Sequence, residues 1–258
     1  MLRLLGLMQN RKAILILIAR PAYETLLMHE GINRLREYFK IDLLCLTFTA
    51  ASDLGKELLS VASSQGFNVF FQNSTDNGPN SLLLDVDKKL SSVLKRSHYH
   101  AVITHPPHGG ENAHPYQIQC FHVARRLCAE LKIPFGFFSD KKVESVEVDT
   151  NLYKLGMRCQ LSLLASYFKC HLKIRKYPLK NCSEILSELK YFLKTLFRRR
   201  KYTLLSFHPN MFEKQSTLDK YRTQLNSLIK FKSYINSVEY LYLERYPNTN
   251  LEIPPIES

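Results

Sequence analysis

Short apolar runs alternate with longer amphipathic segments along the first 140 residues of the chain. The runs are apolar at successive positions, which is typical of strands buried on both faces of a parallel sheet. They predict strands at Ala13–Ala19, Ile41–Thr47, Asn68–Phe71, Ala101–Thr104 and Pro134–Phe138. The intervening segments predict helices at Glu24–Phe39, Asp53–Ser63, Leu82–Lys95 and Ile118–Leu131. This order predicts an α/β fold, a three-layer Rossmann-like sandwich with a mostly parallel sheet.

The alternation ends near Asp140. Apolar residues at helical spacing then predict two helices, Ser183–Lys201 and Lys214–Tyr234, with Ser183 as a candidate N-cap of the first. No linker, repeat or low-complexity run follows Asp140. We therefore expect one domain over residues 1–244, with a βαβα core at 12–140 and basic helices within 141–244. The proline-containing segment 245–258 is expected to be an extended tail.

The positive charge is concentrated in the C-terminal part of the chain. The net charge is +13; residues 1–140 carry 15 basic and 12 acidic side chains, and residues 141–258 carry 21 and 11. The helix ending at Phe197–Lys201 would suit peripheral contact with an anionic membrane surface. Alternatively, its basic last turn complements the helix dipole, or it forms a solvated face. No recognised nucleic-acid-binding motif accompanies the charge, so we expect no specific nucleic-acid partner.

No segment of the sequence predicts insertion into a membrane or export. The longest apolar run, Ala13–Ala19, is far shorter than the roughly 18 residues of a membrane span, and residues 1–8 lack the pattern of a secretory signal. We therefore expect a soluble, cytoplasmic protein. The six cysteines include no Cys-x-x-Cys pair, which favours reduced thiols. A zinc site built from Cys120 and Cys128 is disfavoured, because a separation of eight residues on a helix is poor chelating geometry.

Two loops at predicted strand ends carry the candidate chemistry. Residues 19–24 read ARPAYE and residues 109–117 read GGENAHPYQ. In an open parallel sheet, ligands bind beyond the carboxyl ends of the strands, where the strand order reverses. If the first and fourth predicted strands are neighbours, both loops face one crevice.

These loops resemble the two metal-site motifs of the PIG-L/LmbE family of zinc-dependent de-N-acetylases. The family motifs are Ala-His-Pro-Asp-Asp-Glu and Gly-Gly-Glu-x-x-His-Pro-x-His, each followed by a helix. A third segment is similar to the family's Lys-x-x-Ala-x-x-x-His/Tyr-x-Ser/Thr-Gln helix through Lys214, Tyr221, Thr223 and Gln224. Residues 238–241 resemble its usual ending, so the resemblance runs from about Lys12 to Leu243. It implies a hydrolase acting on the acetamide of N-acetylglucosamine-containing substrates.

The residues at the family's metal positions differ in this chain. The resemblance places Arg20, Tyr23 and Gln117 where the family has its zinc ligands, and Ala22 where it has the general base. Arginine offers no lone pair, glutamine is a weak neutral ligand, and alanine transfers no proton. A guanidinium would also repel a dication at low dielectric. We therefore predict no zinc, no other cofactor and no hydrolysis by the family route.

Several polar residues remain candidates for a binding site. By the resemblance, His114 matches the histidine that stabilises the oxyanion and is the candidate catalytic residue. The candidate ligand-binding residues are Arg20, Tyr23, Glu24, His105, His108, Glu111 and Gln117. Arg20 either binds a phosphate or carboxylate, or pairs internally with Glu24 or Glu111.

These residues favour a degenerate de-N-acetylase homologue whose crevice binds an N-acetylated sugar or glycan. One alternative is an active deacetylase or other hydrolase with a rearranged metal site, because His105, His108, Glu111 and His114 recur every three residues. The other is a non-catalytic interaction protein that acts through its basic C-terminal helix.

Overall fold

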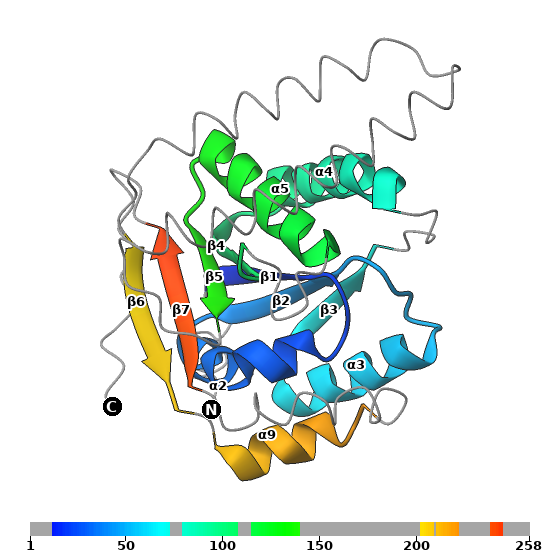
Figure 1. The fold of residues 1–258 in the computed structure, drawn as a ribbon, viewed down its shortest axis with the longest axis vertical. Coiled ribbons are helices and arrows are strands. Elements are labelled where there is room, and N and C mark those ends of the chain that lie inside the picture. The colour runs from blue at the N-terminus through cyan, green and yellow to red at the C-terminus, as the bar shows by residue number, and fades with distance from the viewer. Residues whose placement is uncertain are drawn as a thin grey trace, which may run out of the picture.

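A seven-stranded sheet forms the centre of the molecule (Figure 1). The computed structural model describes residues 12–72, 79–107, 115–139, 202–208, 210–221 and 238–244. The strands are β1 (Ala13–Ile18), β2 (Lys40–Cys45), β3 (Asn68–Phe71), β4 (Tyr99–Thr104), β5 (Phe135–Ser139), β6 (Tyr202–Phe207) and β7 (Glu239–Glu244). Their order is β3-β2-β1-β4-β5-β7-β6. The first five are parallel, whereas β7 runs antiparallel to both β5 and β6.

Helices cover both faces of this sheet. They are α2 (Tyr23–Tyr38), α3 (Asp53–Gln65), α4 (Pro79–Arg96), α5 (Pro115–Leu131) and α9 (Met211–Leu218). Successive residues of β1 point to opposite faces, so Ile16 packs in the core with α2 and α3, and Leu17 packs in the core with α4 and α5. Each fully buried aliphatic side chain of this kind contributes about 1.5 to 3 kcal/mol. The predicted three-layer α/β fold is confirmed.

The turns at the helix ends follow from local sequence. Ser52 caps α3, because its side chain accepts a hydrogen bond from the Gly55 N–H at 3.1 Å. The same helix ends at Gly66, whose φ of 72° lies in the left-handed region that glycine enters without steric cost. Asn210 caps α9 in the same way as Ser52 caps α3, with its side chain accepting from the N–H groups of Phe212 and Glu213.

The C-terminal part of the chain differs from the sequence prediction. The predicted helix Lys214–Tyr234 is wrong at its start and is not continuous, because α9 begins at Met211 and ends at Leu218. Residues 222–234 of this prediction lie outside the described residues. The strands β6 and β7 were not predicted, although they complete the sheet beside β5. Both are antiparallel additions, and antiparallel strands do not follow the βαβα rhythm that predicts the first five strands. The predicted helix Ser183–Lys201 and the tail 245–258 lie outside the described residues.

Within the described ranges, no helix combines the length and apolar character needed to cross a bilayer. The basic cluster predicted to contact an anionic membrane belongs to residues that the structure does not describe.

Candidate ligand-binding crevice

The strand order reverses between β1 and β4, which are neighbours, so the condition for a shared crevice is met. The order runs from β1 through β2 to β3 on one side, and from β4 to β5 on the other. Helix α2 follows β1 and helix α5 follows β4, so both helices begin at the same edge of the sheet (Figure 1). We use the term crevice for the place where these two helix starts meet the ends of β1 and β4. Ligands of open α/β sheets bind at such reversal points.

The backbone of Ala19 is held from both sides at this edge. Its N–H donates to Nε2 of the fully buried His105 at 2.9 Å, and its carbonyl accepts a hydrogen bond from the Thr47 hydroxyl. Because Nε2 accepts, the proton of the neutral imidazole is on Nδ1. His105 extends from the end of β4 and Thr47 from the end of β2. These contacts give His105 a role in fixing the loop after β1; its predicted contact with a ligand stays a prediction.

Helix α2 begins without a side-chain cap. Its N-cap residue is the fully buried Ala22, which has a φ of 74° and accepts no hydrogen bond through its side chain. The left-handed region costs a non-glycine residue about 1 kcal/mol. A helix N-terminus also carries partial positive charge from its first N–H groups. The start of α2 therefore presents positive potential to the crevice.

Arg20 places a full positive charge beside this helix start. Its side chain is partly exposed, and the guanidinium carbon lies 5.8 Å from the centroid of the Phe48 ring. Phe48 follows β2, so the cation–π contact holds the arginine towards the sheet edge. The predicted internal partners of Arg20 are the Glu24 side chain and Glu111, and both lie outside the described part of the structure.

Gln117 lies on the other side of the crevice, in the first turn of α5. Its side chain is 1% exposed, yet neither Nε2 nor Oε1 has a hydrogen-bond partner among the described residues. One turn later, Cys120 and Phe121 pack in the same core cluster as Ala19, so Gln117 lies on the sheet-facing side of the helix. A buried amide left unpartnered costs about 1 to 3 kcal/mol. A ligand that bonds to it would recover this energy.

The remaining predicted site residues are not placed. His108, Glu111 and His114 lie in the undescribed segment between β4 and α5, and the side chains of Tyr23 and Glu24 are likewise not described. The catalytic role of His114 and the rearranged histidine metal site therefore stay predictions.

The described residues of the crevice do not fit zinc. No group of three histidine, cysteine, aspartate or glutamate residues that could hold a metal occurs among them. Arg20 offers a cation instead of a ligand, and Gln117 offers only a neutral amide. Cys120 and Cys128 are buried free thiols, and burial raises the pKa of each thiol. Protonated thiols are poor zinc ligands.

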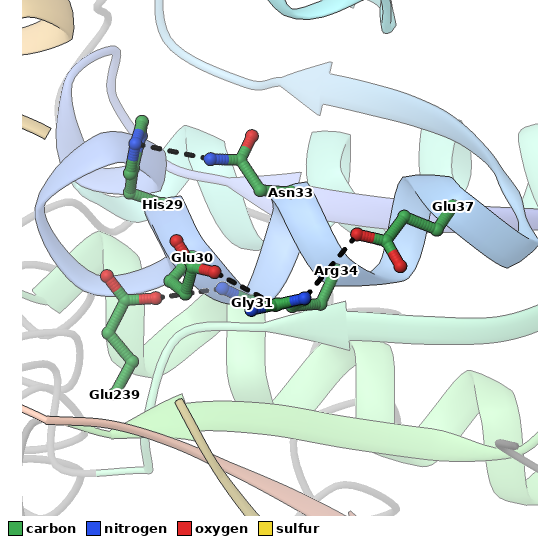
Figure 2. A network of polar contacts seen from close by, with 7 residues as sticks. All are labelled: His29, Glu30, Gly31, Asn33, Arg34, Glu37 and Glu239. Atoms are coloured by element: carbon green, nitrogen blue, oxygen red, sulfur yellow. Dashed lines mark hydrogen bonds and ion pairs between the residues drawn. The ribbon is translucent and has the colours of Figure 1, made fainter. Parts of the chain in front are cut away.

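A second polar region lies under the middle of α2, and the sequence analysis assigned it no role. Lys214 and Glu239 are 0% and 1% exposed, and Lys214 Nζ lies 2.9 Å from Glu239 Oε1. The other carboxylate oxygen, Oε2, accepts a hydrogen bond from the Gly31 N–H at 3.0 Å (Figure 2). Burial raises the pKa of Glu239, whereas Lys214 lowers it. The ion pair connects α9 and β7 to α2.

His29 continues this region towards α3. Its Nδ1 lies 3.1 Å from Gln65 Nε2, and its Nε2 lies 3.3 Å from Asn33 Nδ2 (Figure 2). Gln65 also donates to the Thr217 hydroxyl at 3.5 Å. Burial, followed by the charges of Lys214 and Arg36, lowers the pKa of His29 to about 4. The α2 network, as we name it, comprises His29, Gly31, Asn33, Gln65, Lys214, Thr217 and Glu239.

Gly31 allows α2 to pack closely on the sheet beside this network. A Cβ at this position would lie 2.2 Å from Cε1 of Phe138 in β5. Only a glycine allows α2 to pack this closely on the sheet. Two members of the network, Lys214 and Glu239, belong to the third segment of the PIG-L/LmbE resemblance. That segment could have drawn attention to the two residues, but it does not indicate that they form an ion pair.

Comparisons with known proteins identify the fold. No family model matches the sequence, and no curated protein matches it. Among solved structures, a deacetylase of teicoplanin biosynthesis matches with a TM-score of 0.54 and 8% identity, over 92% of this chain and 99% of that chain. The A40926 pseudoaglycone deacetylase matches with a TM-score of 0.55 and 10% identity, over the same shares. A zinc-inhibited form of teicoplanin deacetylase gives a TM-score of 0.54 and 8% identity, again over 92% and 99%.

These matches confirm the resemblance at the level of the fold: the chain has the LmbE-like deacetylase fold. At 8% to 10% sequence identity, these matches show the architecture alone.

Proposed function

We propose that this chain, with its LmbE-like deacetylase fold, binds an N-acetylated sugar or glycan in the crevice and does not hydrolyse it by the zinc route. The proposal rests on Gln117, a buried amide without a partner among the described residues, at a position where the resemblance implies a zinc ligand. Solved structures of the same fold are named as deacetylases, which supports an acetamido substituent on the ligand.

The chemistry of Gln117 suits an acetamide. The side chain offers one carbonyl acceptor and an NH₂ donor, and an acetamide offers a carbonyl acceptor and an N–H donor. The Gln117 NH₂ can donate to the acetamide carbonyl, or the Gln117 carbonyl can accept from the acetamide N–H. Because a secondary amide is trans, its N–H and carbonyl point in opposite directions, and one glutamine bonds to one of them. In a buried position this hydrogen bond has little competition from water, so it contributes more than it would on the surface. A sugar without the acetamide would leave the Gln117 amide unsatisfied.

The loss of hydrolysis is proposed from the residues that replace the zinc ligands and the base. Zinc hydrolysis requires a metal held by about three ligands with an open position for water. Arg20 opposes a dication at the first ligand position, and Ala22 offers no group that could take a proton from water. The chain keeps the reversal of strand order between β1 and β4, and we propose that it uses the crevice there for binding.

Calorimetric titration and thermal unfolding of the full chain test the binding proposal. We expect N-acetylglucosamine to raise the melting temperature, and glucosamine and glucose to have no effect, because only the first carries the acetamide. The substitution Gln117→Leu should abolish this stabilisation. The matched control is Gln215→Leu, because Gln215 is exposed on α9 and lies away from the crevice. Absence of any response to N-acetylated sugars would refute the proposed ligand class.

Metal analysis and an acetate-release assay test the proposed loss of hydrolysis. After dialysis we expect far less than one zinc per chain, and no acetate release from N-acetylglucosamine conjugates with zinc added. Zinc near one per chain together with acetate release would establish the alternative, an active deacetylase. In that case a double change of His108 and His114 should remove the metal if the rearranged histidine site holds it.

A further inference from the structure

We infer that the ligand of the crevice carries an anionic group, a phosphate or a carboxylate, which Arg20 binds beside the start of α2. This inference rests on the proposed function for the sugar part of the ligand, and it adds a second recognition element to it. The ligand class is then an N-acetylated sugar phosphate or an N-acetylated sugar acid.

The geometry of Arg20 leaves its hydrogen-bonding edge available. The guanidinium carbon lies 5.8 Å from the centroid of the Phe48 ring, a cation–π contact. The guanidinium carries five N–H donors in one plane. No described carboxylate forms an ion pair with Arg20. A planar donor edge of this kind binds phosphate and carboxylate oxygens in a bidentate manner.

The start of α2 adds to the positive potential at the same place. This helix has 16 residues, and its N-cap is an alanine, which supplies no oxygen to the N–H groups of the first turn. Ala22 is only two residues from Arg20, so the arginine and the helix start act on the same volume. An anion there would be stabilised by both the full charge and the helix dipole.

The state of Gln117 is a second, independent indication that this place receives a ligand. Gln117 is 1% exposed, has no partner among the described residues, and lies on the sheet-facing side of the first turn of α5. That first turn contains no acidic residue. Among the side chains that the structure describes, the two helix starts therefore flank the reversal between β1 and β4 with one cation, Arg20, and one neutral amide, Gln117. This arrangement disfavours a metal cation and favours a ligand with both an amide and a negative charge.

The experiment compares neutral and anionic probes by calorimetric titration of the full chain at low ionic strength. The probes are N-acetylglucosamine, N-acetylglucosamine 1-phosphate, N-acetylmuramic acid and inorganic phosphate. We expect at least one of the two anionic sugars to bind ten times or more tightly than N-acetylglucosamine. The phosphate and the carboxylate probes distinguish which of the two groups is recognised. Equal affinity for the neutral and both anionic sugars would overturn the inference.

Variants then assign the effect to Arg20. The change Arg20→Gln should reduce the preference for the anionic sugar to less than threefold, and Arg20→Lys should leave an intermediate preference, because lysine keeps the charge without the bidentate edge. The control is Arg96→Gln, the same change of charge in the last turn of α4, at the opposite edge of the sheet. Unliganded melting curves establish that each variant is folded. An unchanged preference in folded Arg20→Gln would also overturn the inference.

The two proposals fail in different ways. If neutral and anionic N-acetylated sugars bind equally, the proposed function stands and the anionic group alone is refuted. If no N-acetylated sugar binds, but inorganic phosphate binds and Arg20→Gln removes this binding, the anion site stands and the proposed sugar is refuted. If none of the probes binds, both proposals are refuted.

Discussion

Two buried polar regions lie along helix α2, and they differ in how their polar atoms are satisfied. In the α2 network, the buried charge of Lys214 meets Glu239, whose second oxygen accepts from the Gly31 backbone. In the crevice, where α2 and α5 begin, the equally buried amide of Gln117 on α5 has no hydrogen-bond partner within the described ranges. Both regions combine residues from distant parts of the chain.

The difference separates a structural role from a binding role. Buried polar groups in folded proteins are almost always hydrogen-bonded, and each exception requires an explanation. The ion pair of the α2 network requires none, because Lys214 and both oxygens of Glu239 are paired; Asn33 Oδ1, at the margin of the network, has no partner among the described residues. Gln117 does require one, and a ligand that completes its hydrogen bonds supplies it. The following substitutions test whether the two regions differ in this way.

The largest effect is expected from Lys214→Met. The change leaves Glu239 buried without its cation, and breaking a buried ion pair on one side costs about 3 to 5 kcal/mol. Urea denaturation measures the free energy of unfolding. The control is Lys220→Met, because Lys220 is only partly buried and its Nζ donates to the Ser64 hydroxyl at the surface. A loss below about 1 kcal/mol for Lys214→Met would mean that the ion pair is dispensable.

The next effect is a dependence of stability on pH through His29. Its pKa is about 4 in the folded protein and 6.5 in the unfolded chain, so the unfolded state binds more protons between these values. The stabilising contribution is therefore present above pH 6.5 and is lost as the pH falls towards 4. The shift corresponds to about 3 kcal/mol. Urea titrations at several pH values should show this slope, and His29→Gln should reduce it.

His122 also makes the stability depend on pH, so His29→Gln removes only part of that dependence. Burial, followed by the charge of Arg125, lowers the pKa of His122 to about 3. This histidine lies on α5, away from the α2 network, and contributes its own loss of stability in acid. A variant in which both histidines are replaced should have the flattest profile. An unchanged slope in His29→Gln would show that His29 is not buried in its neutral form.

A somewhat smaller effect is expected from Gly31→Ala. The new methyl group would lie 2.2 Å from Phe138 Cε1, so α2 must move away from the sheet or the phenyl ring must shift. Overpacking of this kind costs about 1 to 3 kcal/mol. The control is Gly66→Ala, where nothing lies within 4 Å of the added methyl and only the φ of 72° opposes it. If Gly66→Ala destabilises the protein more than Gly31→Ala, the close approach of α2 is not needed.

The sequence predicts the parallel half of this fold well, and the reason is physical. Strands such as β1 are buried on both faces and therefore read as continuous apolar runs, which are easy to recognise. The strands β6 and β7 follow another pattern. In β6, for example, Leu204 is exposed, whereas Phe207 is buried. Such mixed, six-residue antiparallel strands give a weak signal next to helical patterns.

The same contrast applies to the two polar regions. Arg20 and Gln117 could be identified from the sequence because each lies in a short motif next to a strand end. The α2 network could not, because its contacts join residues far apart in the chain: Gly31 and Glu239 are separated by 208 positions. The partners of a buried charge are set by the packing of α9 and β7 on α2. No local pattern encodes that packing.

The smallest and most specific effect is expected from one substitution made in both regions. Gln117→Leu replaces an unpartnered buried amide by an apolar side chain of similar length, and should stabilise the unliganded protein by about 1 kcal/mol. Gln65→Leu makes the same change in the α2 network, where the amide contacts both His29 and Thr217. It should destabilise the protein by about 1 to 3 kcal/mol, because the partners of the amide are left buried.

Urea denaturation of Gln117→Leu and Gln65→Leu without ligand shows whether each substitution raises or lowers the free energy of unfolding. Opposite signs mean that the crevice gives up stability to keep a binding group, whereas the network uses its polar groups to hold the fold. Destabilisation of similar size in both variants would show that Gln117 is as fully bonded as Gln65, and the distinction between the two regions would then fail. The measurement requires no knowledge of the ligand, so it tests the binding role of the crevice independently of any sugar.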